Sequence, residues 1–149
     1  MKKLFAVFLV MLLAVACWSI DIYRGTQFTP AWDAVTTMVD GTPIAPTDTV
    51  SYEVYYSPVA DPGNPSVQDP QNPAAHTFYG ATTALEIVFD VPQDGQVYAI
   101  AVRAVLVDEL AQTFYSTLNW SYENGELTPN PFLYQQSGNP ASPKGLNRD

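Results

Sequence analysis

Apolar residues recur at every second position through most of this chain, and thirteen prolines interrupt the sequence. Side chains two residues apart share one face of a β-strand, whereas an amphipathic helix needs apolar residues three and four positions apart. Proline also removes a backbone donor and disfavours the interior of a helix. The pattern therefore predicts an all-β fold of short strands, without long helices in the part that follows the leader.

The strongest expected strand runs from Val97 to Val107 and is apolar on both faces apart from Arg103. Such a strand belongs in the middle of a sheet. The alternation predicts further strands at Ile20 to Ile22, Phe28 to Ala34, Val50 to Tyr56, Leu85 to Phe89 and about Thr113 to Trp120. Short alternating strands separated by proline-rich turns predict an antiparallel β-sandwich.

The first residues have the composition of an export signal. Lys2 and Lys3 precede an apolar run from Leu4 to Ala16, shorter than the ~20 residues that span a hydrocarbon core. The run ends in Leu-Ala-Val-Ala before Cys17, the only cysteine. This ending resembles a bacterial lipobox, which implies a signal peptide over residues 1–16, acylation of Cys17 and attachment to a membrane. Ordinary signal peptidase cleavage is the alternative, because Ala-Val-Ala suits that enzyme too.

The same resemblance implies a location. It describes an exported bacterial lipoprotein whose residues 17–27 form an anchored N-terminus with a short first strand. Trp18 follows the cysteine where an Asp would favour the inner membrane. The resemblance therefore favours the outer membrane or the cell surface.

The net charge of −9 argues against one class of partner. Removal of Lys2 and Lys3 with the leader makes the mature chain more negative still. An acidic surface repels the phosphate backbone of nucleic acids. We therefore expect no nucleic-acid partner, and no sequence motif indicates a cofactor.

Residues Tyr98 to Ala104 resemble the sixth strand of a fibronectin type III domain, which reads Tyr-x-apolar-x-Val-x-Ala. The resemblance covers about residues 28–125 and implies a structural core that includes Trp32, Tyr52, Tyr98 and Val102. It implies that the buried Tyr98 bonds an upstream backbone group through its hydroxyl. The chain departs from the family at Pro92, where Leu is usual, and at Pro30 inside the second strand.

Two segments lack any period. Residues 58–75 contain a near-repeat of Asp-Pro and Asn-Pro pairs, and a loop of that length is either functional or disordered. Residues 126–149 are polar and proline-rich apart from Phe132 to Tyr134, which predicts a flexible tail. Together with residues 37–49, the first segment is expected to form a contact surface at the ends of the sandwich.

Catalytic chemistry finds little support in the sequence. His76 is the only histidine, and no Ser or Cys stands in a nucleophile motif. Asp108 and Glu109 are adjacent, so on a strand they would point to opposite faces instead of forming a catalytic pair. An enzyme is therefore the least favoured function.

Two weaker binding sites remain open. Asp61 and Asp69, with Asn64 and Asn72, offer oxygen ligands to calcium, although Asp-Pro and Asn-Pro pairs are also ordinary turn starters. Tyr55 and Trp120 are candidates for an exposed aromatic surface that binds a sugar or a protein. The sequence thus predicts a non-catalytic binding or structural module of the cell envelope with an unknown protein or glycan partner. A carbohydrate-binding module is the alternative.

Overall fold

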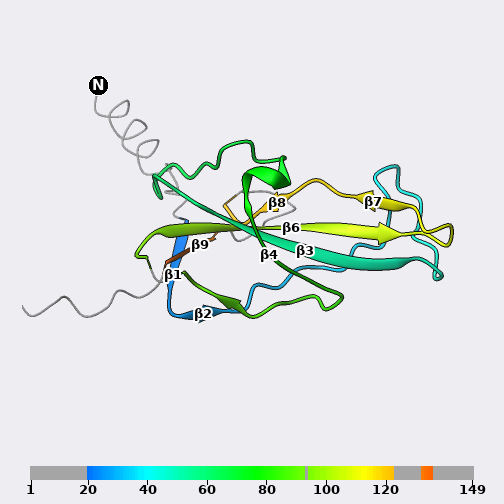
Figure 1. Ribbon diagram of the computed structural model, residues 1–149, viewed down its shortest axis with the longest axis horizontal. Helices are drawn as coiled ribbons and strands as arrows, with labels where there is room; N and C mark the ends of the chain where they lie inside the picture. The colour runs from blue at the N-terminus through cyan, green and yellow to red at the C-terminus, as the bar shows by residue number, and fades with distance from the viewer. Residues whose placement is uncertain (1–19, 93, 123–131, 136–149) are drawn as a thin grey trace, which may run out of the picture.

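The computed structural model of this chain describes residues 20–92, 94–122 and 132–135. Within these ranges the protein is all β apart from one turn of 3-10 helix, Pro73–Ala75. Figure 1 shows an elongated molecule with one large sheet along its long axis. The strands are β1 (Asp21–Arg24), β2 (Gln27–Phe28), β3 (Thr49–Pro58), β4 (Thr77–Thr82), β5 (Phe89–Asp90), β6 (Val97–Val107), β7 (Thr113–Tyr115), β8 (Asn119–Trp120) and β9 (Phe132–Gln135).

The two longest strands, β3 and β6, form the antiparallel centre of the large sheet. Their pairing extends from Thr49 opposite Val107 to Pro58 opposite Tyr98. The alternation of apolar residues predicts both strands, and β6 has the predicted bounds. β4 pairs with the other edge of β3. Alternation does not predict β4, because two adjacent aromatic residues and Gly80 break any period of two.

Three short strands follow one another along the outer edge of β6, namely β9, β8 and β7. β7 and β8 confirm the strand expected between Thr113 and Trp120, with a break at residues 116–118. Serine side chains act at the irregular points. Ser116 Oγ accepts a hydrogen bond from Ala104 N–H at 2.9 Å, and Ser121 Oγ accepts one from Ile100 N–H at 3.1 Å.

The last strand, β9, lies between β6 and β1 and runs parallel to β1. The prediction of a flexible tail is therefore wrong for Phe132–Gln135, where Leu133 and Tyr134 are 0% and 2% exposed. A purely antiparallel architecture is wrong as well, since this pair makes the large sheet mixed. Alternation locates strands but does not assign their partners or directions, and three apolar residues are too few to reveal a period.

A separate two-stranded ladder, β2 with β5, packs on one face of the large sheet. Hydrogen bonds continue this ladder beyond β2, because Ile87 N–H donates to Pro30 C=O at 3.2 Å and Trp32 N–H donates to Leu85 C=O at 2.9 Å. Pro30 has no N–H to donate back to Ile87. The strand is therefore interrupted at the proline that the sequence places inside it.

Each face of the large sheet has its own apolar cluster, because successive residues of β6 point to opposite sides. We call one side the ladder-covered face, since β2 and β5 lie on it, and the other the loop-covered face. The cluster of the ladder-covered face is Val54, Phe89, Val91, Tyr98, Ile100 and Tyr134. The cluster of the loop-covered face is Tyr55, Val59, Val97, Ala99, Ala101, Leu118, Trp120 and Leu133.

The proline-rich segment after β3 covers the second of these faces, where Val59 and Val67 contribute to its cluster. The Gln71 side chain accepts from Leu118 N–H at 2.9 Å and donates to Leu118 C=O at 3.0 Å. Trp120 Nε1 donates to Pro70 C=O at 2.7 Å. These contacts give residues 58–75, expected to be either a functional contact loop or a disordered one, a role in packing the core.

The leader, Cys17 and the remaining tail residues lie outside the described ranges. Inside those ranges, the structure holds no helix with the length and apolar character needed to cross a membrane.

Candidate ligand-binding groove

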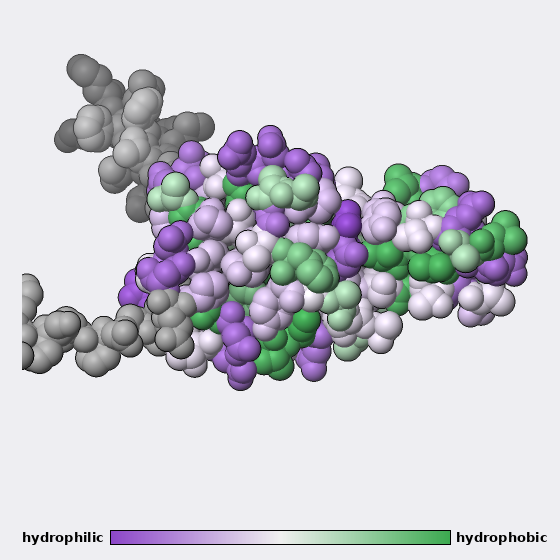
Figure 2. All heavy atoms as spheres, viewed as in Figure 1, coloured by the Kyte–Doolittle hydropathy of each residue, from purple (hydrophilic) through white to green (hydrophobic). Residues whose placement is uncertain are grey.

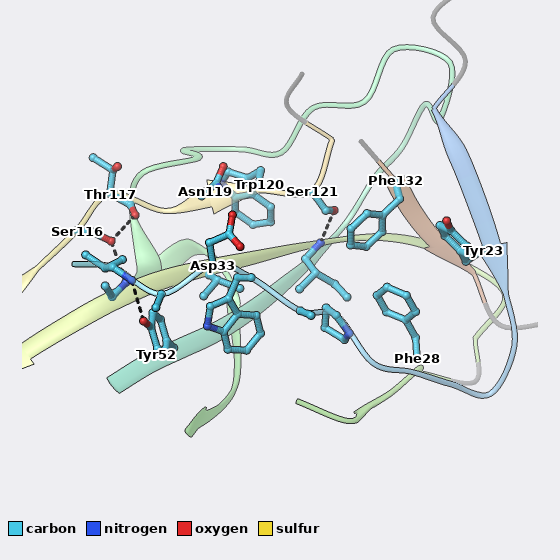
Figure 3. A pocket seen from close by; sticks show the side chains of 18 residues that line it. Tyr23, Phe28, Asp33, Tyr52, Ser116, Thr117, Asn119, Trp120, Ser121 and Phe132 are labelled. Carbon is cyan, nitrogen blue, oxygen red and sulfur yellow. Dashed lines mark hydrogen bonds between the residues drawn. The ribbon is translucent and has the colours of Figure 1, made fainter. Parts of the chain in front are cut away.

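A groove of about 740 Å³ opens on the ladder-covered face, between residues 30–35 and the β8 edge (Figure 3). Its floor is formed by Ile100, Val102 and Ala104, which point the same way because they alternate along β6. Ligand sites in proteins commonly have volumes of roughly 300–1,000 Å³ and largely apolar linings. The groove therefore has the size and floor of a ligand site.

An aromatic cluster closes one end of the groove. Tyr23 stacks on Phe28 with ring centroids 5.7 Å apart, and Phe132 meets these two rings edge-on at 5.9 and 5.1 Å. The three rings come from β1, β2 and β9. Tyr23 remains 50% exposed, so its ring is accessible at this end. Rings held by neighbours in this way offer apolar contact area at a small loss of side-chain entropy.

The other end of the groove is polar. Figure 3 shows Asp33 pointing across it toward β8. Asp33 is exposed, and it is the one charged residue among the described residues that line the groove. The Ser116 hydroxyl already bonds backbone groups of Ala104 and Thr117. Asp33 is therefore the group best placed to give the groove a charge preference.

The four residues expected in the structural core all lie on the ladder-covered face. Tyr52 and Tyr98 are 4% and 5% exposed, whereas Trp32 and Val102 are partly buried. Trp32 packs on Tyr52 with ring centroids 5.5 Å apart, and the Tyr52 hydroxyl accepts from Val35 N–H at 3.1 Å. Trp32, Tyr52 and Val102 also line the groove. The sequence thus identified residues of the site by their packing role without indicating that a groove lies between them.

Tyr98 has a different partner from the one that the family resemblance implies. Its hydroxyl donates to the carboxylate of Asp94, four residues upstream, and not to a backbone group. Burial, reinforced by this hydrogen bond, raises the pKa of Tyr98. The same hydrogen bond lowers the pKa of Asp94. The hydrogen bond between Tyr98 and Asp94 thus connects the start of β6 to the turn that precedes it.

The two aromatic residues proposed as an exposed surface are both buried. Tyr55 is 6% exposed and Trp120 is 0% exposed, so the expectation that their rings face outward is wrong. Residues 58–76, which have no period of their own, cover this face. The His76 ring also packs edge-on against Trp120 at 4.6 Å, which places the histidine against the core instead of on a free loop edge.

Asp61 and Asp69 both make hydrogen bonds within turns. The Asp61 carboxylate accepts from Gly63 N–H at 2.9 Å, and the Asp69 carbonyl accepts from Asn72 N–H at 2.8 Å. In the part of the chain that the structure describes, no group of three His, Cys, Asp or Glu side chains is placed to hold a metal ion. The geometry favours the turn interpretation of these prolines and acids over calcium.

Arg103, the charged residue in the middle of β6, pairs with Glu53 across the strands at 2.6 Å. The Tyr55 hydroxyl donates to the same carboxylate at 2.7 Å, and the guanidinium lies 4.3 Å from the ring centroid of Tyr115. Both charged side chains thus have partners within the sheet. This cluster belongs to the packing of β3 on β6.

A second apolar surface lies at the end of the molecule away from β1. Figure 2 shows hydrophobic side chains gathered there, around the turn between β6 and β7 and the loop before β3. The exposed members include Val39 at 104%, Leu110 at 75% and Phe114 at 42%. Residues 37–49, expected to be a contact loop, are thus an exposed loop with apolar side chains at its tip.

We find no family model, no curated protein and no solved structure that matches this chain.

Proposed function

We propose that this chain is an exported, lipid-anchored binding module whose ligand occupies the groove on the ladder-covered face. The observation that carries the proposal is the groove itself. Its apolar floor, its aromatic end and the carboxylate of Asp33 combine the features that bind and orient a ligand.

A fibronectin type III-like sandwich is the finer fold that we propose. In immunoglobulin-like sandwiches the third, sixth and seventh strands share one sheet, and the second and fifth belong to the other. Residues Tyr52 to Tyr56 resemble the third strand of the family and lie on β3, which pairs with β6, the strand that resembles the sixth. The last expected strand, β7 with β8, pairs with β6, and β2 pairs with β5. This order supports the resemblance, whereas the parallel β1–β9 pair departs from it.

The proposed anchor would hold the β1 end of the molecule near the lipid surface. Two residues lie between Cys17 and Ile20, so the three Cα–Cα steps span at most about 11 Å when fully extended. Val39 and Leu110 are exposed in the loop before β3 and in the turn between β6 and β7. Figure 1 shows these two segments at the end of the molecule opposite β1. The groove then faces sideways, accessible to a partner in the same compartment.

A binding role is favoured over hydrolysis of glycosidic bonds, the one enzymatic alternative with a sequence basis. That chemistry needs two carboxyl groups on either side of the scissile bond. Among the described residues that line the groove, Asp33 supplies one carboxyl group and its neighbours are aromatic, aliphatic, hydroxyl or amide side chains. The groove thus has the means to hold a ligand without a paired acid and base.

Site-specific photocrosslinking on intact source cells tests the proposal. A benzophenone side chain at Ala34, which lines the groove, should give a discrete crosslinked product, and the same group at exposed Ala60 should not. Equal products from both positions, or none from Ala34, would remove the groove as the binding surface. A mass spectrum of the mature native protein tests the anchor, since an unmodified Cys17 would exclude it.

A further inference from the structure

We propose that the groove binds an extended peptide segment of another protein, which adds as a β-strand to the edge formed by residues 29–33. This inference rests on the proposed binding role and names the class of ligand. The inference is argued from the backbone N–H and C=O groups of residues 29–33, which form one wall of the groove, and from the side chains that line it.

The hydrogen bonds of the β2–β5 ladder define this edge. Thr26 C=O accepts from Val91 N–H, just after β5, and Pro30 C=O accepts from Ile87 N–H. Trp32 N–H donates to Leu85 C=O, so every second residue bonds in that direction. In an antiparallel ladder the residues between them direct their N–H and C=O groups to the other side. Thr29, Ala31 and Asp33 are those residues, and no described residue bonds their backbone groups.

An open edge of this kind binds an added strand through main-chain hydrogen bonds. Alternate side chains of the added strand would point toward the floor at Ile100 and Val102, because a strand presents every second residue to one face. The volume of about 740 Å³ accommodates several such side chains. A compact ligand such as a sugar ring would leave the edge of residues 29–33 without partners.

The charge of the groove specifies the peptide further. Asp33 faces into the groove, and none of the described residues lining it is basic. The whole chain has a net charge of −9, which disfavours a second copy of itself as the occupant. The favoured ligand is therefore a strand of alternating apolar residues with a Lys or Arg opposite Asp33.

A side-chain donor without a partner also favours a peptide as the ligand. The indole N–H of Trp32 is buried without a hydrogen-bond partner among the described residues, and Trp32 lines the groove. A buried donor without a partner destabilises the protein that holds it. A peptide carbonyl would satisfy this donor once the Trp32 ring turns to expose its nitrogen, which has no accessible surface in the unbound structure.

The test uses the mature chain carrying Cys17→Ser and a nine-residue acetylated peptide of alternating Val and Thr with one central Lys. We expect binding in the micromolar range and at least tenfold slower hydrogen exchange at the Ala31 and Asp33 amides. Methylation of every second peptide nitrogen should abolish binding, and Lys replaced by Glu in the peptide should weaken it at least tenfold. Asp33→Asn should remove the preference for Lys, whereas Glu109→Gln, at an exposed turn, should retain it.

Several results would overturn the inference. Peptide binding that leaves both amides unprotected would mean an apolar pocket without strand addition. A dimer that protects them in the absence of peptide would make a second copy the occupant, and binding of an oligosaccharide without any peptide would make the ligand a glycan. If no peptide binds while the Ala34 crosslink persists, this inference fails alone; if the crosslink is also absent, the proposed function fails with it.

Discussion

The two faces of the large sheet are covered in different ways, one by a loop and the other by a short ladder. On the loop-covered face, residues 58–76 bury Trp120 and bond both its indole N–H and the backbone of Leu118. On the ladder-covered face a groove remains beside the β2–β5 ladder. Among the described residues each face keeps one buried side-chain nitrogen without a partner, Trp32 Nε1 on the ladder-covered face and His76 Nδ1 on the loop-covered face. The faces therefore differ in the groove and in how the covering segment bonds the sheet.

The difference comes from where the hydrogen bonds end. Gln71 reaches the strand edge with both a donor and an acceptor, so it mimics a neighbouring backbone. Pro30 differs, because it accepts from Ile87 N–H but has no N–H to donate, and the ladder resumes with Trp32 N–H on Leu85 C=O. One side-chain amide therefore bonds its face with a donor and an acceptor, whereas the ladder on the other face lacks one donor.

The largest effect should follow from Trp120→Ala. This change removes a fully buried indole from the loop-covered face, and we expect the free energy of unfolding to fall by about 3–5 kcal/mol. Trp32→Ala should reduce it by about 1–2 kcal/mol, since that ring is only partly buried. Urea unfolding of both variants measures the contrast, and equal losses would mean that the two faces are covered alike.

Gln71→Ala should come next. It leaves the N–H and C=O of buried Leu118 without their partners, so we expect a loss of about 1–3 kcal/mol in unfolding free energy. The Leu118 amide should also exchange its hydrogen faster. Gln68→Ala, at an exposed position of the same loop, is the matched control and should change neither quantity. A loop that stayed equally resistant to proteolysis in Gln71→Ala would contradict the sealing role of this amide.

Tyr98→Phe tests the fastening of β6 on the ladder-covered face and should destabilise less than Gln71→Ala. The pKa of Asp94 is lowered in the folded state, so its contribution is present above the ordinary Asp pKa of about 3.9 and is lost as the pH falls through the folded value. The pKa of Tyr98 is raised, so its contribution is present below about pH 10 and declines above it.

The stability difference between the wild type and Tyr98→Phe should therefore be greatest from about pH 5 to 9 and shrink on both sides. Thermal melting across this range provides the measurement, and Tyr23→Phe, whose ring is half exposed, is the control. A difference that did not vary with pH would mean that the hydroxyl of Tyr98 does not stabilise the fold through Asp94.

The sequence predicts the strands of this fold better than it predicts what lies on them. Alternation locates β3 and β6 because both faces of the sheet are apolar along their length. It does not reveal that Trp120 is covered, because the covering loop contributes single apolar residues and hydrogen bonds that have no period. It misses the parallel partner of β1 for a related reason, since β9 is short and follows a polar segment.

The groove leaves only one trace in the sequence, the proline inside the second expected strand. Pro30 predicts an edge or an irregularity there, and the structure has that irregularity at the groove wall. The site could not be derived from it, because the pocket depends on which residues of β6 and β8 lie opposite. Those neighbours are set by pairing across the sheet and not by local sequence.

The smallest effect is expected for Trp32→Phe, and Trp120→Phe is its comparison for the other indole N–H group. Trp120→Phe loses a hydrogen bond to Pro70 C=O and leaves that carbonyl without its indole donor, so about 1–2 kcal/mol of unfolding free energy should be lost beyond the change in packing. Trp32→Phe loses no hydrogen bond, because the donor it removes has no partner. Removal of an unsatisfied donor offsets the reduced packing of the smaller ring on Tyr52, so the net change in unfolding free energy should be within about 1 kcal/mol of zero.

Urea unfolding of the two variants, first without ligand and then with a saturating peptide ligand, measures the change in unfolding free energy in each state. If the groove donor serves a bound chain, Trp32→Phe should become destabilising relative to the wild type only in the complex, whereas a loss of the same size in both states would place that donor in the structural core.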